Sequence, residues 1–123
     1  MIEVIPEETL AMEKDTGFCK VTAIIRCEVL EKVERRLREL GVPGISVTHV
    51  KGYGEYTNFY NPEGTTKHAR VEIFTSAKRA EVIAQAIMDA AHSGVAGYGI
   101  IAVLPVEKIY RIRHHLKMKP DDI

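Results

Sequence analysis

Two Gly-Tyr-Gly tripeptides are the part of this chain that comes nearest to a recognisable binding motif. One occupies residues 52–54, after an alternating apolar and polar run, and the other occupies residues 97–99, before an apolar run. Glycine lets backbone N–H groups approach an anionic ligand closely, so such turns at strand ends can bind phosphate. Neither tripeptide has the third glycine and helix start of a dinucleotide site or the Lys-Ser/Thr of a P-loop. On this pattern alone, an ordinary tight turn remains the better interpretation.

A pair of arginines near the end of the chain is the second group that could bind an anion. Arg111 and Arg113 are two residues apart, which places both guanidinium groups on one side if the segment is extended. Two guanidinium groups together would clamp a phosphate or a carboxylate. Taken alone, the pair is better interpreted as part of a solvated charged surface, which His114 and His115 extend.

The other chemistry-bearing residues do not match a catalytic or metal-binding signature. The serines lie outside nucleophile motifs such as Gly-x-Ser-x-Gly, and the five histidines lack the spacing of a zinc site. Cys19 and Cys27 lie at the two ends of one predicted strand, roughly 26 Å apart at about 3.3 Å per residue, which is too far for a disulfide. We therefore expect no enzymatic activity, no bound metal, and two free thiols that suit a reducing compartment.

Composition and charge indicate one globular domain and exclude several classes of partner. The chain has 123 residues, 46% of them hydrophobic, and its 17 basic residues balance 17 acidic ones. A neutral chain without long runs of like charge is not expected to bind nucleic acid or anionic membranes. The longest apolar stretch, residues 100–106, is far shorter than the roughly 20 residues of a membrane-spanning helix. The acidic start lacks the basic region of a secretory signal, so we expect a cytoplasmic protein without membrane insertion.

The elements that would position these residues follow from hydrophobic periodicity. β-rich or alternating patterns predict strands over residues 18–25, 45–50, 69–75 and 100–104. Apolar residues at helical spacing predict one helix over residues 30–40 and a second after a cap at Thr75 or Ser76. The order strand, helix, strand, strand, helix, strand is typical of the split βαβ arrangement. The predicted fold is therefore α+β and ferredoxin-like, a four-stranded antiparallel sheet with two helices on one face.

The domain boundaries are placed where the periodic patterns stop. Residues 1–17 are expected to form an N-terminal tail, residues 18–113 the folded domain, and residues 114–123 a C-terminal tail. Within the domain, residues 55–67 contain Asn-Pro-Glu-Gly and little apolar content, which predicts an exposed loop. Residues 106–113 are expected to form a short extended or helical segment.

The motifs, taken jointly and in this order, resemble the family of PII-like signalling proteins from Lys20 to Arg113. The segments that carry the resemblance lie at residues 22–26 (Thr-Ala-Ile-Ile-Arg), 40–44 (Leu-Gly-Val-Pro-Gly), 46–54, 71–73, 90–94, 97–99, 104–106 and 111–113. The resemblance implies a homotrimer of ferredoxin-like subunits. It also implies that an adenine nucleotide lies in clefts between neighbouring subunits, so that the glycine turns and the arginine pair belong to one site.

The residues that match the family's nucleotide site fall into four groups. The start of the family's T-loop, which leads into the loop at residues 55–67, is matched by Gly52, Tyr53 and Gly54, and the B-loop is matched by Gly97 and Gly99. The positions around adenine and ribose are matched by Ile24, Gly44, Ser46, Glu72 and Phe74. The pair that reaches the phosphates across the subunit boundary is matched by Arg111 and Arg113.

Three departures from the family pattern change the expected ligand. The typical Gly-Asp-Gly-Lys reads Gly-Tyr-Gly-Ile at residues 97–100, so a lysine that usually meets the distal phosphates is missing. The usual Arg-Gln after the T-loop's first glycines is Glu55-Tyr56, which removes a glutamine that helps bind magnesium and 2-oxoglutarate. The loop is also several residues shorter. We therefore expect ADP or AMP to bind better than ATP, with no further cofactor.

The resemblance also indicates partners and leaves alternatives open. Short-loop members of the family are associated with bicarbonate transport, which makes bicarbonate a candidate second ligand and a transporter or carbon-metabolism protein a candidate target of the loop. One alternative is a nitrogen-regulatory PII protein that senses ATP and 2-oxoglutarate. Two others are a metal-responsive trimeric binding module that uses His114 and His115, and a slow nucleotide hydrolase that depends on the arginine pair.

Overall fold

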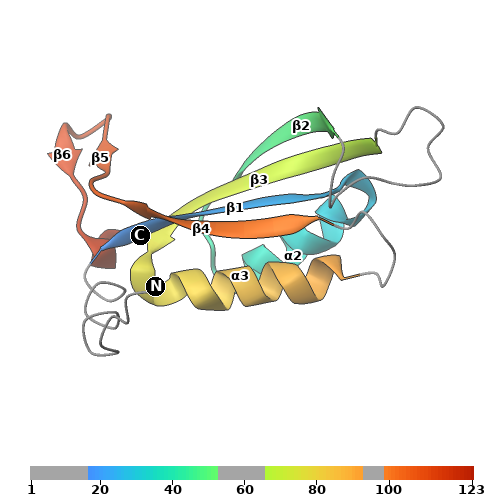
Figure 1. Ribbon diagram of the computed structural model, residues 1–123. Helices are drawn as coiled ribbons and strands as arrows, with labels where there is room; N and C mark the ends of the chain where they lie inside the picture. Colours follow the sequence, from blue (N-terminus) through green and yellow to red (C-terminus); the bar gives the residue numbers. More distant parts are fainter. Residues whose placement is uncertain (1–16, 53–65, 93–98) are drawn as a thin grey trace, which may run out of the picture.

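The computed structural model describes residues 17–52, 66–92 and 99–123 (Figure 1). Its main elements are four strands and two helices. They are β1 (Phe18–Arg26), α2 (Leu30–Glu39), β2 (Ser46–Gly52), β3 (Thr66–Ser76), α3 (Ala77–Ala91) and β4 (Ile100–Val106). Short elements complete the chain: the 3₁₀ turns η1 (Cys27–Val29) and η2 (Pro120–Asp122), and the strands β5 (Tyr110–Arg111) and β6 (Leu116–Lys117).

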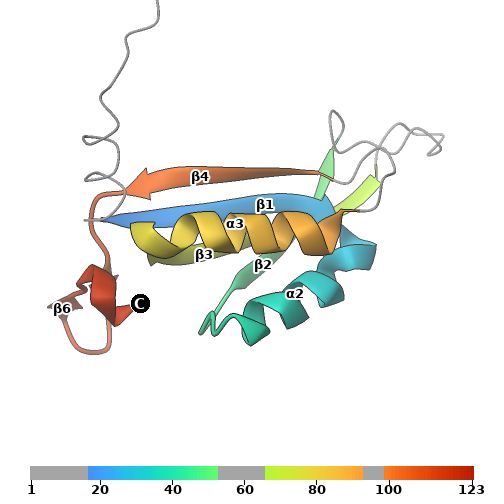
Figure 2. The same cartoon turned by 90° about the horizontal axis from the view of Figure 1, so that it is seen from below.

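The four main strands form one antiparallel sheet in the order β2-β3-β1-β4. Both helices cover the same face of this sheet, and the opposite face carries no helix in the described part of the chain (Figures 1 and 2). The predicted α+β ferredoxin-like fold is confirmed. Among the described residues, no helix is long and apolar enough to cross a membrane.

The core lies between the sheet and the helices because alternate strand residues point toward α2 and α3. Val21, Ala23 and Ile25 of β1 are fully buried, as are Val71 and Ile73 of the neighbouring strand. The helices supply the matching apolar faces, in which the small alanines of α3 allow close packing on the sheet. The buried helix residues are Val33, Leu37, Ala80, Ile83, Ala86, Ile87 and Ala91.

α2 ends at a glycine, and a side-chain hydrogen bond connects its end to α3. Gly41 follows the helix with φ +79°, a conformation that favours glycine. The Gly41 N–H donates to the Arg38 carbonyl at 3.0 Å, and the Val42 N–H donates to the Leu37 carbonyl at 3.0 Å. The guanidinium of Arg79 in α3 donates to the Leu40 carbonyl at 2.6 Å. The end of α2 is therefore held against the start of α3.

Several element ends differ from the sequence predictions. β3 begins at Thr66 and not at Ala69, so the last two residues of the predicted 55–67 loop belong to a strand. Ser76 occupies the N-cap position of α3, but its side chain makes no capping hydrogen bond. The segments 1–16 and 55–65 lie outside the described residues.

The C-terminal segment is also more ordered than predicted. Residues 114–123, expected as a tail, contain β6 and η2, and β6 pairs with β5. The fold therefore continues past the predicted boundary at residue 113, because the chain turns back and pairs with itself.

Both cysteines are free thiols. Cys19 packs against the edge of the core, and burial raises the pKa of its thiol. Cys27 was predicted to end the strand, but it begins η1 directly after β1.

Candidate functional site on the open face of the sheet

The sheet face that no described helix covers, here called the open face, carries four of the predicted site residues. Side chains alternate between the two faces of a strand, so the partners of the buried residues point to this side. Ile24 lies here on β1, Ser46 on β2, and Glu72 and Phe74 on β3. Phe74 is 51% exposed. The face combines polar groups with apolar side chains that water contacts.

Strand register gathers charged groups around Glu72. Ser46 and Thr22 are its two register partners on the neighbouring strands. The Lys20 ammonium forms an ion pair with Glu72 Oε2, and Arg70 Nε lies 3.0 Å from Glu72 Oε1. That Arg70 nitrogen is buried and makes no hydrogen bond in the described structure, so its attraction to the carboxylate is electrostatic.

These cations keep Glu72 ionised. The hydrogen bond from Lys20 lowers the pKa of the Glu72 carboxyl, and the charges of Lys20 and Arg70 act in the same direction while partial burial opposes them. A carboxylate held in this state accepts hydrogen bonds from hydroxyl or amino groups of a ligand. Lys20 and Arg70 were not among the predicted site residues, because only the strand register shows that they flank Glu72.

We expect this arrangement to make stability depend on pH in the acid range. A carboxyl whose pKa is lowered by folding stabilises the protein fully above the pKa of the unfolded chain. This stabilisation is lost as the pH falls through the lower pKa of the folded state. Urea unfolding of wild type and Glu72→Gln over a series of acidic pH values should show a steeper loss in the wild type.

Glu31→Gln is the matched control for this prediction. The Glu31 side chain is 91% exposed, and its nearest cation, on Arg35, lies 4.0 Å away. An exposed pair of this kind contributes little to stability. The Glu31 variant should therefore follow the wild-type curve, and a Glu72→Gln curve parallel to wild type would contradict the role of the Lys20 ion pair.

Gly99 lies directly against β1 at the start of β4. Its φ is +109°, and a methyl group at this position would overlap the carbonyl oxygen of Ile24 and lie 2.8 Å from its carbonyl carbon. The next residue, Ile100, is the register partner of Ile24. The structure thus brings together two predicted site residues, Ile24 and Gly99, at one end of the sheet, with a backbone approach that only glycine permits.

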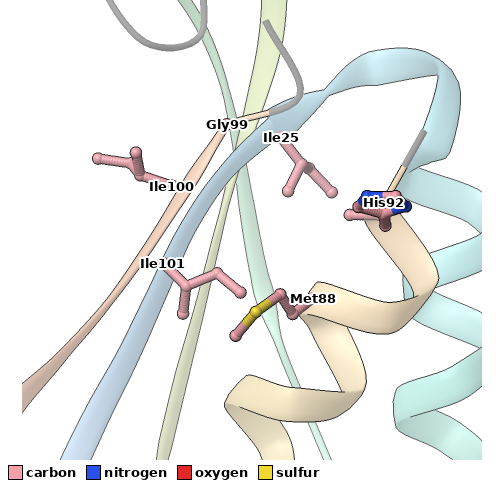
Figure 3. Close-up of a pocket in the computed structure, with 7 residues that line it drawn as sticks. Ile25, Met88, His92, Gly99, Ile100 and Ile101 are labelled. Atoms are coloured by element: carbon pink, nitrogen blue, oxygen red, sulfur yellow. The ribbon is translucent and has the colours of Figure 1, made fainter. Parts of the chain in front are cut away.

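An apolar pocket of about 220 Å³ lies next to this glycine. Figure 3 shows the residues that line it. Ile25 and Ile101 point from the sheet toward Met88 of α3, while Ile100 points to the other side of β4 (Figure 3). The pocket is lined by Ile25, Met88, Ala91, His92, Gly99, Ile100 and Ile101. It therefore lies on the helix side of the sheet, and the side chain of Ile100 belongs to the open face.

The other glycines of the predicted site lie in different places. Gly52 ends β2 opposite Thr66, at the same end of the sheet as Gly99. Gly44 lies in the exposed segment between α2 and β2 and lines a separate hollow of about 440 Å³ on the α2 side. The structure does not place Gly44 on the open face. Tyr53, Gly54 and Gly97 lie outside the described residues.

The arginine pair lies at the opposite end of the sheet. Arg111 belongs to β5, which follows the end of β4, whereas Gly99 precedes its start (Figure 1). The seven residues of β4 span about 20 Å at roughly 3.3 Å per residue. Within one chain, therefore, Arg111 does not reach Gly99 or Ile24. Arg113 lies in the turn after β5 and not in the same strand as Arg111, so the extended segment that would place both guanidinium groups on one side does not include Arg113.

The described residues show no group of three or more His, Cys, Asp or Glu side chains placed to hold a metal ion. The chemistry of the open face is instead that of hydrogen bonding and of apolar contact. An ionised carboxylate on Glu72 lies two residues from exposed Phe74 on β3 and opposite the hydroxyl-bearing Ser46 on β2, and Gly99 precedes exposed Ile100 at the end of the sheet. Such a surface suits a ligand that has a flat apolar part and polar edges.

Comparison with known proteins gives a consistent result. The family model described as nitrogen regulatory protein P-II matches residues 18–116. The chain is 37% identical over 109 residues to nitrogen regulatory protein GlnK2 of Haloferax mediterranei, covering 83% of this chain and 89% of that protein. It is 36% identical over 101 residues to nitrogen regulatory protein P-II of Azospirillum brasilense, covering 76% and 90%.

A solved structure agrees with the sequence matches. The crystal structure of Arabidopsis thaliana PII bound to citrate superposes with a TM-score of 0.73 at 30% identity. The match covers 85% of this chain and 91% of that chain. The similarity therefore extends over nearly the whole fold and is not confined to one motif.

Proposed function

The chain belongs to the nitrogen regulatory protein P-II family of signal-transduction regulators, and on this premise we propose that it is a trimeric sensor of an adenine nucleotide. ADP or AMP is the proposed ligand, bound in clefts between subunits. The bound nucleotide changes the state of the 55–67 loop, which contacts a target protein. A ligand shifts such an equilibrium only by its difference in affinity for the two loop states.

The observation that carries this proposal is the separation of the two halves of the site. Gly99 and Ile24 lie at one end of the sheet, and Arg111 lies past the other end, at least about 20 Å away along β4. Guanidinium groups that bind the same phosphates as Gly99 must therefore come from another subunit. A site completed by a neighbour requires an oligomer.

The open face supplies a surface on which such a neighbour can pack. Ile100 is 46% exposed and Leu104 is 43% exposed, and both point to the open face from the edge strand β4. Apolar side chains gathered on one uncovered face favour burial against a second copy of the chain.

The side chains favour a nucleotide that has few phosphates. Phe74 or Ile24 offers apolar contact to a base, and the Glu72 carboxylate can accept hydrogen bonds from ribose hydroxyls or an amino group. Ile100 brings no charge to the open face beside Gly99, so this position does not itself stabilise a third phosphate. Bicarbonate is proposed as a second, small anion that binds beside the nucleotide.

A second candidate is a nitrogen sensor that binds ATP and 2-oxoglutarate. This candidate is favoured by the names of two relatives that are 36–37% identical to this chain, because both are nitrogen regulatory proteins. The two candidates share the fold, the trimer and the position of the site. They differ in the ligand that stabilises the folded protein.

A thermal-unfolding panel separates these candidates. AMP, ADP and ATP are each added with and without magnesium, bicarbonate or 2-oxoglutarate, and light scattering gives the mass in solution. A ligand specific for the folded state raises the melting temperature. Stabilisation by ADP or AMP that bicarbonate increases is the expected result, together with a trimer mass. Stabilisation only by ATP with 2-oxoglutarate would establish the nitrogen sensor, and a monomer that no nucleotide stabilises would contradict both.

A further inference from the structure

One of the two free thiols of this chain lies beside a histidine. The Sγ atom of Cys27 is 3.8 Å from Nδ1 of His49, and Nδ1 accepts the thiol hydrogen when the ring carries its proton on Nε2. The two residues belong to η1 and β2, so only the fold brings them together. A thiol that can give its proton to an imidazole becomes a nucleophilic thiolate. Cys27 is only partly buried, so a small reagent can reach its sulfur.

A small residue on the intervening strand allows this contact. β3 lies between β1 and β2, so the backbones on either side of it are separated by twice the strand spacing of about 4.8 Å. Ala69 of β3 is the register partner of both Ile25 and His49, and it is fully buried on the core side of the sheet. Because the Ala69 side chain is a single methyl group, the side chains of Cys27 and His49 can meet across it.

Two lysines give the same face a positive charge. Lys51 lies two residues after the histidine on β2, so its side chain points to the same face, and Lys67 of β3 is its register partner. Like charges directly opposite each other are destabilising, and an anion between them would offset their repulsion. Among the described residues, no carboxylate forms an ion pair with either lysine. Glu28, which follows Cys27 along the chain, is paired with Arg26.

The other thiol, Cys19, lies in contrasting surroundings. It is at the opposite end of β1 and packs against the edge of the core, where burial raises the pKa of its thiol and keeps it protonated. Its register partners are Thr75 and Pro105, neither of which is a base. Cys19 is therefore expected to be the less reactive thiol, and it provides an internal comparison for Cys27.

We propose that Cys27 is a modification site for small disulfides that carry negative charge. His49 accepts the thiol proton, and the Cys27 thiolate attacks one sulfur of the disulfide. The S–S bond of the reagent breaks, a new S–S bond to Cys27 forms, and the departing thiolate takes the proton from His49. Lys51 and Lys67 attract the negatively charged groups of the disulfide. This site does not depend on the proposed nucleotide.

Reaction of the full chain with dithiobis(nitrobenzoate), a disulfide with two carboxylates, tests the proposed reactivity. Peptide mass spectrometry assigns the label to Cys27 or Cys19 at each time point. At neutral pH we expect Cys27 to react roughly tenfold faster than Cys19. His49→Gln should slow the labelling of Cys27 roughly fivefold, because an amide cannot take up the thiol proton. Equal labelling rates of the two thiols in wild type, or wild-type Cys27 kinetics in His49→Gln, would overturn the proposal.

An uncharged disulfide, dithiodipyridine, tests the role of the lysines. Lys51→Gln/Lys67→Gln should slow the labelling of Cys27 by dithiobis(nitrobenzoate) roughly fivefold, and by dithiodipyridine less than about twofold. Lys78→Gln/Lys108→Gln is the matched control. It removes the same charge from exposed positions that follow the ends of β3 and β4, at the other end of the sheet, where salt screens the charge beyond about 10 Å. Equal losses with both reagents would overturn the preference for anionic disulfides.

Two readouts keep these tests independent of misfolding. A variant that unfolds exposes both thiols, so slower labelling of Cys27 at an unchanged Cys19 rate reports on the site itself. The wild type gives a test without any substitution, because added salt should slow its reaction with the anionic disulfide and leave its reaction with the uncharged one unchanged. A Cys27 rate that is insensitive to salt with both reagents would overturn the role of Lys51 and Lys67.

Discussion

Gly99→Ala is expected to lower the free energy of unfolding by about 3 kcal/mol or more. Two effects add at this position. An L-residue at φ +109° is strained by about 1–3 kcal/mol, and the new methyl group would overlap the Ile24 carbonyl. The overlap involves backbone atoms of two paired strands, so β4 must move away from β1 to relieve it. Urea unfolding of wild type and variant measures the difference.

Gly41→Ala separates the two effects, because it has the strain without the overlap. Its φ is +79°, and a methyl group there meets no atom within 4 Å. Its expected cost is about 1 kcal/mol, that of the left-handed conformation alone. Equal losses in the two variants would show that Gly99 does not lie against Ile24 as described. A larger loss of unfolding free energy in Gly99→Ala than in Gly41→Ala, together with weaker nucleotide binding, would show that the close contact between Gly99 and Ile24 belongs to the ligand site.

The fold was predictable from sequence because most of its elements have one buried face. Val71 and Ile73 alternate with polar residues in β3, and Val33 and Leu37 recur at helical spacing in α2. These patterns are local, so they can be seen in a single chain. The order of the elements then leaves few arrangements, of which the split βαβ sheet is one.

The ends of the elements were less predictable because they depend on pairing between distant residues. β3 begins at Thr66 because Gly52 and Lys51 of β2 pair with its first residues. The C-terminal hairpin turns at His115, which takes a left-handed conformation without being glycine or asparagine. Neither feature leaves a periodic or compositional signal in its own segment.

The candidate site was predictable in composition but not in arrangement. The family resemblance indicated Glu72, yet its two cations become visible only when strand register brings Lys20 and Arg70 beside it. The spacing of Arg111 and Arg113 would place both side chains on one side only in an extended segment, whereas the structure places Arg113 in a turn. A pattern along one chain could not show that the arginines lie a sheet length away from Gly99.

The double variant Arg111→Ala/Arg113→Ala is expected to weaken ADP binding by about 2–4 kcal/mol while the trimer survives. Each substitution removes a charge-assisted contact to phosphate. Both side chains are exposed in the single chain, so their loss should not unfold it. Arg35→Ala/Arg36→Ala is the matched control, since it removes two exposed arginines from α2, whose ion pairs stay on that helix. Unchanged ADP affinity in the Arg111/Arg113 variant, measured by calorimetry, would refute the phosphate assignment.

Mixing variant subunits shows whether these arginines act across a subunit boundary. Phe74→Ala removes an exposed apolar contact from the open face, and the double arginine variant removes the phosphate contacts. If each site takes Phe74 from one subunit and the arginines from the next, a mixed trimer contains one kind of interface with both sets intact. Mixtures of the two weak binders should then recover a fraction of wild-type ADP sites at wild-type affinity. If both sets came from the same subunit, every site in a mixed trimer would lack one of them and no recovery would occur, even after complete subunit exchange.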